Sequence, residues 1–411
     1  MQETDSVLVS LEAQLQRLEK WFDENGYAGW DPYDISGTKF YLNLLKDRPN
    51  IYKKIFRLCF SISADIFPLF IRKILKVETQ VNAKAMGLLL TSYTNLFVAT
   101  KNTLYIDKAI NVAHWLIAHR TNGYNGFSWG YPFDWQSVIL IPQNTPSSVV
   151  TAVVGDGFYS LYKITQDEQY INICKAICSF FVNSLHRSVD EEGKVCFSYT
   201  PIDDYQVHNA NLFVGEFLAR VGREVNNENW VELGIKCGNF ALSEQQDEGY
   251  LPYWSLAQTE THSGNIIRTD HYHSGFEIRM LYGLWVTTGL EQFRQAYQKY
   301  YEWYLSNMFT EGGLVKLTPT RYYPVNIHAI AESILCQATL LDCYPERLYS
   351  IKSIIKWAEQ NMEYKGGRYV YMIKKYPAFG EWKIKIPMIR WGQSWMLRAL
   401  SQALVASKHL G

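Results

Sequence analysis

The chain has 411 residues, of which 47% are hydrophobic and 15% aromatic, and this is enough to bury a large core. Its 40 Lys and Arg residues balance 40 Asp and Glu residues. No global electrostatic field is therefore available to hold nucleic acid or an anionic membrane surface, and a polyanion would have to be bound locally.

The N-terminal part of the chain reads as helices interrupted by one turn-rich loop. Residues 6–24 have the periodicity of an amphipathic helix, the segment from Gly26 to Thr38 is rich in Gly, Pro and Asp between aromatic residues, and residues 39–80 again indicate helix. We therefore predict an N-terminal helical segment, residues 1–80, that packs on the remainder of the chain.

Three features of the sequence bear on its location. The N-terminus carries acids where a signal peptide needs basic residues. The most apolar stretch, Cys59 to Leu75, is broken by Asp65, Pro68 and Arg72 and is shorter than the roughly 20 clean residues of a membrane-spanning helix. The seven cysteines contain no CxxC pair, which is typical of a reducing compartment. These features predict a cytoplasmic protein without a transmembrane segment.

From Val81 onward the chain repeats a pattern of helix, short turn, second helix and aromatic-rich loop. The second helices are expected to start near Tyr105, Tyr170, Trp230, Gln292 and Arg347. The intervals between these starts are roughly 55–65 residues, and periods of this size indicate helical hairpins that each need a neighbour to bury an apolar face. We predict an all-α fold with at least about 55% helix, in which residues 81–411 form a complete or incomplete α/α toroid.

In such a ring the first helix of each hairpin lines the inside, so the N-termini of these inner helices should gather around one mouth. The junctions that lead into them are NTPSSVVTA (144–152), QVHNANLFVGEF (206–217), DHYHSGFEIR (270–279), VNIHAIAES (325–333) and IRWGQSWMLR (389–398). Helix capping alone would be satisfied by Ser, Thr, Asn and Asp. The additional imidazole and guanidinium groups predict a functional mouth at which His208, Tyr272, His328 and Arg390 converge.

The stretch from Gln245 to Arg279 carries the densest group of titratable and aromatic side chains and is predicted to be the chemical centre. Its candidate residues are Asp247, Tyr250, Tyr253, Trp254, His262, Arg268, Asp270, His271, Tyr272, His273 and Glu277. Aromatic side chains suit the faces of a sugar ring, and the titratable groups suit proton transfer. The alternative is a long polar surface loop closed by a capped helix.

Several motifs resemble the α/α-toroid, six-hairpin-glycosidase-like proteins that are encoded with bacterial surface-polysaccharide biosynthesis genes. The motifs are WGYPFDWQS (129–137), TPSSVVTAVVGDGFYSLYKIT (145–165), CFSYTP (196–201) with VHNANL (207–212), and DHYHSGFEIRMLYGL (270–284). The resemblance covers roughly residues 120–340 and implies a carbohydrate-active catalytic domain. Trp129 and Asp134 in the first motif, together with Trp254, Glu277, His328, Glu332, Arg390 and Trp391, are further candidates for substrate binding.

The segment Gly249–Tyr253 followed by Arg268–His273 is similar to the C-terminal helical domain of heparan glucuronyl C5-epimerases. In that domain, a Tyr after a Gly turn and a Tyr within an Arg-x-Asp-Tyr-His string flank the uronate. The similarity implies Tyr253 and Tyr272 as catalytic residues. This sequence differs by the insertion of His271 between Asp270 and Tyr272 and by the lack of the β-rich domains that those epimerases carry upstream.

The chemistry of a uronyl C5-epimerase or lyase can also be argued from the groups themselves. Removal of H5 requires neutralisation of the adjacent carboxylate, for which the candidates are Arg268, His208 and Asn209. We predict that Tyr272 is the base, with its pKa lowered from about 10 by His271 and His273. Reprotonation by Tyr253 would give an epimer, whereas departure of the C4 substituent would give β-elimination. Asp270 is expected to orient a histidine.

Two other classes of function stay open. A glycoside hydrolase would use two carboxylates, and the candidates near the predicted mouth are Asp134, Asp156, Asp247, Asp270, Glu277 and Glu332, although no pair stands out by spacing. Glu216, Glu277 and Glu332 are equally suited to pairing with an Arg of the ring. A noncatalytic glycan-binding protein would present aromatic residues without a working acid and base.

The expected partner is a saccharide, whether an oligosaccharide, a polysaccharide or a sugar linked to lipid, and not a nucleic acid. No metal is expected, because His271 and His273 would point apart on a helix and have no acid or Cys partner at ligand spacing. No Gly-rich phosphate loop follows a strand, so no nucleotide cofactor is expected.

Overall fold

The computed structural model describes residues 2–45, 51–263 and 268–410. Helices make up 62% of the chain as described, and the sheets are few and small. The prediction of a predominantly helical, all-α fold is therefore confirmed.

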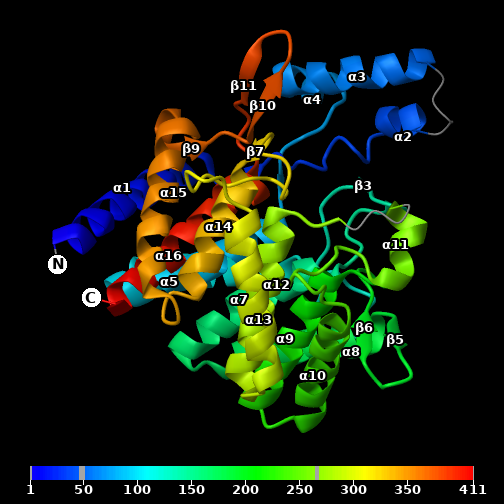
Figure 1. Ribbon diagram of the computed structural model, residues 1–411, viewed down its shortest axis with the longest axis vertical. Coiled ribbons are helices and arrows are strands. Elements are labelled where there is room, and N and C mark those ends of the chain that lie inside the picture. Colours follow the sequence, from blue (N-terminus) through cyan, green and yellow to red (C-terminus); the bar gives the residue numbers. More distant parts are fainter. Residues whose placement is uncertain (1, 46–50, 264–267, 411) are drawn as a thin grey trace.

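In the described part of the chain, six inner helices form a closed ring, each packing on the next and the last on the first (Figure 1). In ring order they are α5 (Ala83–Thr100), α7 (Ser148–Thr165), α9 (His208–Glu224), α12 (His271–Thr288), α14 (Ile327–Thr339) and α16 (Trp395–Leu410). Ring neighbours and the outer layer cover these helices on several sides, which is why α14 is buried over nearly its whole length.

An outer helix packs on each inner helix. The outer helices are α6 (Leu104–Ala118), α8 (Glu168–Ser184), α10 (Glu228–Ser243), α13 (Glu291–Asn307), α15 (Leu348–Asn361) and α1 (Gln2–Asn25). The first five follow their inner helices in the chain, as the repeats predict. The sixth, α1, comes from the N-terminus and packs on α16, so the two ends of the chain together complete the last hairpin of the α/α toroid. The division at residue 80 stays a prediction.

The inner helices begin at one end of the ring, which we call the mouth. Four of them are capped there by a side chain that accepts backbone N–H groups of the first turn, namely Asn82, Ser147, Asp270 and Asn326. Such caps satisfy helix N–H groups that have no partner within the helix. The last inner helix is instead preceded by a wide helical turn, Ile389–Ser394.

Short antiparallel strands connect the hairpins. They pair as β1 (Ala28–Gly29) with β2 (Gln80–Val81), β3 (Trp135–Gln136) with β4 (Leu140–Ile141), β5 (Arg187–Val189) with β6 (Val195–Phe197), β8 (Glu363–Tyr364) with β9 (Arg368–Tyr369), and β10 (Met372–Tyr376) with both β7 (Val325–Asn326) and β11 (Gly380–Ile384). An additional helix, α11 (Leu256–Ser263), lies in the loop before α12.

Three helices, which we call the arm, lie outside the ring. They are α2 (Lys39–Leu45), α3 (Ile51–Ile66) and α4 (Pro68–Ile74). In Figure 1 the arm projects along the upper edge of the molecule beside β10 and β11. Within the described ranges, no helix has both the length and the apolar character that crossing a membrane requires.

Candidate functional site

Aromatic side chains from loops and inner helices that are far apart in the sequence meet at the mouth. Tyr33 stacks on Trp135 with 4.9 Å between ring centroids, and Tyr272 stacks on His328 at 4.6 Å. Trp391 contacts both pairs, at 5.5 Å from Tyr33 and 4.8 Å from His328. We call this group the mouth cluster, and its members are Tyr33, Tyr131, Trp135, Tyr199, Tyr253, Tyr272, His273, His328 and Trp391. Several of these rings are partly exposed, so the cluster offers flat apolar faces of the kind that stack on sugars.

Asp270 and His273 form a dyad in the mouth cluster. The Oδ1 atom of Asp270 accepts the backbone N–H of His273 at 3.1 Å, and its Oδ2 atom lies 2.7 Å from His273 Nδ1. The carboxylate therefore fixes a proton on Nδ1 and leaves the lone pair on Nε2. The side chain of His273 is 19% exposed, and its ring lies beside those of Tyr253 and Tyr272, at 4.7 and 4.4 Å. An oriented imidazole between two phenols is suited to proton transfer.

His328 lies next to the dyad and is buried. Among the described residues, neither of its ring nitrogens has a hydrogen-bond partner, and neither does Nε1 of Trp391. Burial lowers the pKa of His328 well below its ordinary value, and the nearby Lys84 and Arg390 lower it further, so the imidazole is neutral. Buried polar groups without a partner are rare in folded proteins. These three nitrogens are therefore buried polar atoms beside the dyad whose hydrogen bonding is not satisfied by the described residues.

Lys84, the second residue of α5, places a buried ammonium group near the same rings. Its Nζ lies 4.9 Å from the ring centroid of Trp395 and 5.9 Å from that of Phe276, and it forms no ion pair with a described residue. Burial lowers its pKa well below the ordinary value, and the charge of Arg390 acts in the same direction. An anionic group of a ligand would relieve this desolvation, because an opposite charge stabilises the ammonium form.

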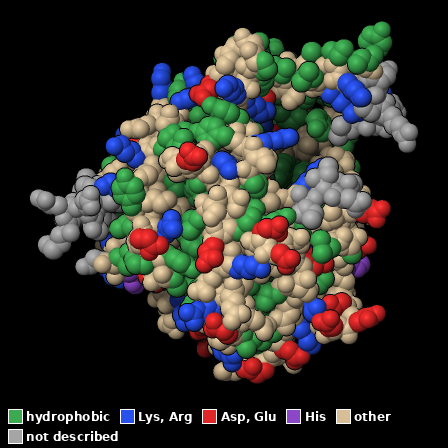
Figure 2. All heavy atoms as spheres, viewed as in Figure 1, with side chains coloured by type: hydrophobic (Ala, Val, Ile, Leu, Met, Phe, Trp, Pro, Cys, Tyr) green, Lys and Arg blue, Asp and Glu red, His purple; other side chains and the backbone are tan. Residues whose placement is uncertain are grey.

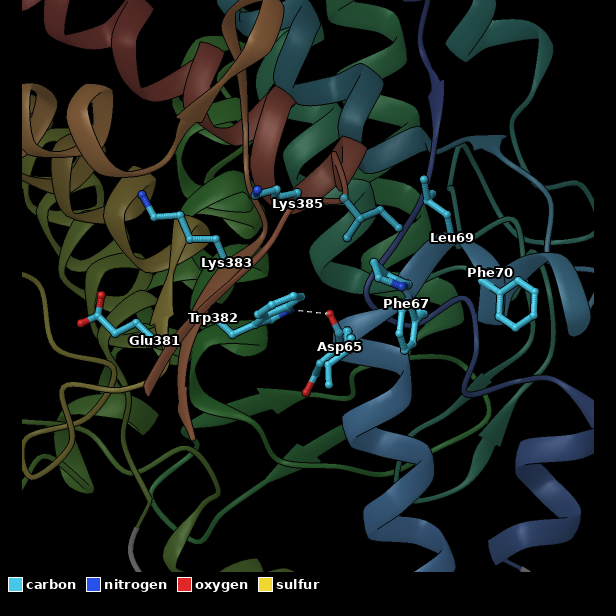
Figure 3. A pocket seen from close by; sticks show the side chains of 11 residues that line it. Asp65, Phe67, Leu69, Phe70, Glu381, Trp382, Lys383 and Lys385 are labelled. Carbon is cyan, nitrogen blue, oxygen red and sulfur yellow. Dashed lines mark hydrogen bonds between the residues drawn. The ribbon is translucent and has the colours of Figure 1, made fainter. Parts of the chain in front are cut away.

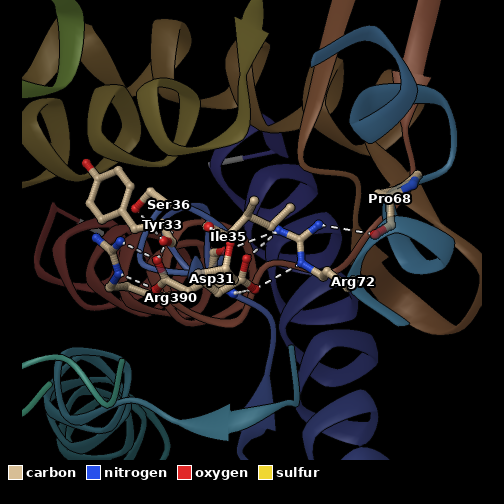
Figure 4. A network of polar contacts seen from close by, with 9 residues as sticks. Asp31, Tyr33, Ile35, Ser36, Pro68, Arg72 and Arg390 are labelled. Carbon is tan, nitrogen blue, oxygen red and sulfur yellow. Dashed lines mark hydrogen bonds and ion pairs between the residues drawn. The ribbon is translucent and has the colours of Figure 1, made fainter. Parts of the chain in front are cut away.

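Arg390 is held by the N-terminal loop (Figure 4). Its guanidinium donates to both carboxylate oxygens of Asp31 at 2.7 Å and lies over the ring of Tyr33 at 4.8 Å. In the same loop, Asp34 pairs with Arg72 of α4 at 2.8 Å. Arg390 is thus neutralised by Asp31, and its contacts fix the loop that carries Tyr33 rather than leaving the guanidinium free for a carboxylate.

The predicted lowering of the Tyr272 pKa is wrong. Burial raises the pKa of Tyr272 well above its ordinary value, and the negative charge of Asp270 raises it further. Burial likewise raises the pKa of Tyr253. His271 is neutral and turned away, and the carboxylate of Asp270 places a negative charge next to His273. Both phenols are therefore protonated and carry a proton that can be donated.

His271 and His208 lie at the mouth end of their helices but point away from the mouth cluster. The buried Nε2 of His271 lies 2.5 Å from the hydroxyl of Tyr304, and burial lowers the pKa of His271 to about 3. Nε2 of the buried His208 lies 2.7 Å from Glu244. Of the four residues expected to converge, Tyr272, His328 and Arg390 do so and His208 does not. The next residue, Asn209, is buried with no partner for its Oδ1 among the described residues.

The remaining candidates for stacking and substrate binding do not belong to the mouth cluster. Trp129 is fully buried and donates from Nε1 to the backbone of Leu116 at 2.8 Å, so it is a core residue. Asp134 is exposed and accepts the backbone N–H of Gln143. Trp254 is buried at the edge of Tyr253, with 5.1 Å between ring centroids. Arg268 is exposed.

The carboxylates that a hydrolase would need are engaged elsewhere. The buried Glu332 pairs with Arg279 at 2.7 Å and accepts Nε1–H of Trp395 at 3.0 Å. Asp156 contacts Arg220 near the middle of the ring, so it is not at the mouth as expected. Of the other candidates, Glu277 accepts the hydroxyl of Tyr300 at 2.6 Å and Asp247 is exposed. Glu216, which was considered as a partner of an Arg of the ring, pairs with Arg220.

Sequence reasoning missed Asp31, Tyr33 and Lys84. Asp31 and Tyr33 lie in the loop Gly26–Thr38. The aromatic residues and turns of this loop are visible in the sequence, but the loop is far from the repeats along the chain, so its position at the mouth was not predicted. Gly37 permits this packing, because a Cβ atom there would overlap the backbone oxygen of Asp134. The signal for Lys84 is a cation two residues after the cap of the first inner helix.

No family model matches the sequence, and a comparison with curated proteins finds no match. Solved structures match in fold. A sugar epimerase from a ruminal bacterium has a TM-score of 0.61 and 14% identity over 80% of this chain and 90% of that chain. A GH76 α-mannanase from Bacteroides thetaiotaomicron has a TM-score of 0.59 and 12% identity over 81% and 88%. Cellobiose 2-epimerase from Bacillus thermoamylovorans has a TM-score of 0.59 and 11% identity over 80% and 90%. The chain thus shares the α/α-toroid fold of these proteins.

Proposed function

We propose that the chain is a carbohydrate-active enzyme that removes the proton at C5 of a uronate residue, with His273 as the base. The observation that carries this proposal is the 2.7 Å contact between Asp270 and His273, which leaves Nε2 of an oriented imidazole beside two protonated phenols. His273 thus takes the role that the sequence suggested for Tyr272. The resemblance to surface-polysaccharide biosynthesis proteins and to heparan C5-epimerases stays a prediction.

The reaction begins with transfer of H5 from the sugar to Nε2 of His273, which becomes an imidazolium stabilised by Asp270. The electron pair of the broken C–H bond moves into the adjacent carboxylate, so negative charge develops on its oxygens. Lys84 and the phenol groups supply positive charge and hydrogen-bond donors for this anion. Neutral His328 is a further donor through one ring nitrogen.

The intermediate has two outcomes at the same site. Proton donation to C5 from the opposite face by Tyr253 or Tyr272 gives the epimer, and the tyrosinate and imidazolium then return to their starting states by proton exchange with solvent. Loss of the C4 substituent, with a phenol protonating the leaving oxygen, gives an unsaturated sugar. The substrate is an oligosaccharide, a polysaccharide or a lipid-linked sugar that contains a uronate.

The support for the other two classes is weaker. Among the described residues, Asp31 and Asp270 contact the mouth cluster and are each bound to a basic partner. Asp203 also contacts the cluster, but it accepts the backbone N–H of Tyr199 and the hydroxyl of Thr200. An inverting or retaining hydrolase needs a pair of carboxylates that faces the glycosidic bond. A noncatalytic glycan-binding protein has no use for an oriented Asp–His dyad. The structural neighbours include both epimerases and a mannanase, so they favour carbohydrate chemistry without choosing between reactions.

The proposal is tested by incubating the full-length protein with a panel of uronate-containing and neutral saccharides. Epimerised or unsaturated products from the uronate group alone, detected by NMR and ultraviolet absorbance, are the expected result. New reducing ends from a neutral saccharide, without either product, would assign the chain to the hydrolases.

A further inference from the structure

The arm exposes an unusual amount of apolar surface. No residue of α3 is buried, and Tyr52, Leu58 and Phe70 are 78%, 60% and 61% exposed. The other exposed large apolar residues of the arm are Phe40, Ile51, Ile55, Phe56, Phe67, Leu69 and Ile74. Monomeric soluble proteins rarely expose contiguous apolar patches of this kind unless the patch binds a partner or a membrane.

Apolar residues of α3 form a stripe along one face of the helix. Ile51, Ile55 and Leu58 recur at intervals of three and four residues, which places them on the same side of an α-helix. At about 100° per residue, the exposed Lys54 falls at the edge of this stripe. A helix that combines exposed aliphatic and aromatic residues with Lys and Arg is typical of helices that lie in the membrane interface.

The charge of the arm is of one sign. Arg72 and Asp65 pair with Asp34 and Lys374, which lie outside the arm. Four exposed lysines lie in the described residues from 39 to 76, namely Lys39, Lys54, Lys73 and Lys76, and Asp65 is the one acidic residue described there, whereas the whole chain has a net charge of zero. In Figure 2, hydrophobic side chains follow the arm along the upper edge, with Lys and Arg side chains beside them. An anionic surface is complementary to this local charge.

The apolar surface continues into a cavity between α4 and the β10–β11 hairpin (Figure 3). The cavity has a volume of about 590 Å³, and its lining includes Phe67, Phe70 and Trp382, with Lys383 and Lys385 at the hairpin side. Nε1 of Trp382 donates to the backbone oxygen of Asp65 at 3.2 Å, and Asp65 also accepts the hydroxyl of Tyr376 at 2.7 Å. The arm is thus fixed to the hairpin while its outer face stays open.

The arm also starts close to the mouth. Tyr33 belongs to the mouth cluster, and α2 begins only six residues later at Lys39, a stretch that spans at most about 20 Å even when fully extended. Arg72 of α4 is anchored to Asp34 in the same loop. A surface bound by the arm would therefore lie near the mouth of the ring.

We propose that the arm docks the protein on the surface of an anionic phospholipid bilayer, with the apolar residues of α3 and α4 inserted at the interface and the exposed flanking Lys residues on the lipid headgroups. The arm lies on the membrane rather than spanning it. A second copy of the chain is a poorer occupant, because a two-fold interface sets the same patch against itself and would bring like charges together.

The test is cosedimentation of the full-length protein with vesicles of phosphatidylcholine alone or of phosphatidylcholine and phosphatidylglycerol in equal amounts. Binding to the anionic vesicles that weakens as salt is raised is expected. The double variant Lys54→Glu, Lys73→Glu should lower the affinity at least about 25-fold, since each basic residue near an anionic surface contributes a factor of about five. The variant Ile55→Asp, Phe70→Asp should abolish binding.

The matched control is Val189→Asp, Val286→Asp, which places two acids at apolar sites that are 57% and 61% exposed and lie outside the arm. This control should bind anionic vesicles nearly as well as the unaltered protein does. All variants should have the melting temperature of the unaltered protein, because the altered side chains are exposed. Failure to bind anionic vesicles, equal binding to both vesicle types, or equal loss in the control overturns the proposal. Dimerisation in the absence of vesicles that the arm variants abolish would assign the surface to a second copy and also overturn it.

Discussion

Replacement of Asp270 by Asn removes one charge from the mouth while keeping the shape of the side chain. Asn caps helices as well as Asp does, so it continues to accept the backbone N–H of His273 that Asp270 accepts at 3.1 Å. The 2.7 Å contact with His273 Nδ1 loses its charge. Hydrogen bonds to charged groups contribute about 1.5–3 kcal/mol, so we expect kcat on the active uronate saccharide to fall about 10- to 150-fold if the bond to the imidazolium is weakened by that amount.

The matched control is Asp167→Asn. Asp167 caps the outer helix α8 in the same way, by accepting the backbone N–H of Gln169 at 2.9 Å, but lies on the exposed outside of the ring. This variant should keep full activity. His273→Asn should lose at least about 100-fold, the lower end of the range for a general base. If Asp270→Asn and His273→Asn both retain the rate of the unaltered protein, the dyad does not perform the proton transfer.

Three further predictions concern the phenols, the buried histidine and the buried ion pair. One of Tyr253 and Tyr272 is expected to donate the proton to the intermediate. Replacing that residue by Phe should slow product formation about 100-fold, while exchange of H5 at His273 persists. Full activity in both Tyr253→Phe and Tyr272→Phe would limit the two rings to stacking. His271 has a pKa of 6.5 in the unfolded chain and about 3 in the folded one. Between these pH values the unfolded chain binds the extra proton, so the free energy of unfolding falls as the pH falls, by about 1.4 kcal/mol per pH unit. Urea unfolding at pH 7 and pH 5 should show this loss and His271→Gln should reduce it, whereas identical urea midpoints would contradict it. Glu332→Ala leaves Arg279 buried without its partner and should lower the free energy of unfolding by about 3–5 kcal/mol. An unchanged unfolding midpoint would refute the structural role of this pair.

The fold could be predicted because it depends on a signal that repeats. The regular hairpin periods and the helical spacing of apolar residues fix the number and order of the layers, and the second helices start close to the predicted positions, as with α8 at Glu168 against Tyr170. The five hairpins, the last helix and the N-terminal helices were together expected to close the ring, and α16 indeed packs on α1 from the opposite end of the sequence. The repeat period does not specify which N-terminal helix takes that place, because ring closure decides the pairing.

The site was predicted in part, for a reason that lies in helix geometry. The N-terminus of an inner helix brings a residue to the mouth, but the direction of its side chain turns by about 100° with each position. Thus His271 points into the outer layer toward Tyr304, while His273 faces the mouth cluster. The pKa of Tyr272 was mispredicted because counting neighbouring cations along the sequence omits burial and the negative charge of Asp270, which both raise this pKa.

Incorporation of solvent deuterium at C5 tests the central claim most directly. The full-length protein is incubated in D₂O with the uronate-containing saccharide, and the C5–H signal is followed by NMR before and after product forms. Loss of that signal with the unaltered protein, and its persistence with His273→Asn, is the predicted result. Release of reducing sugar with the C5–H signal intact would contradict proton abstraction and favour hydrolysis.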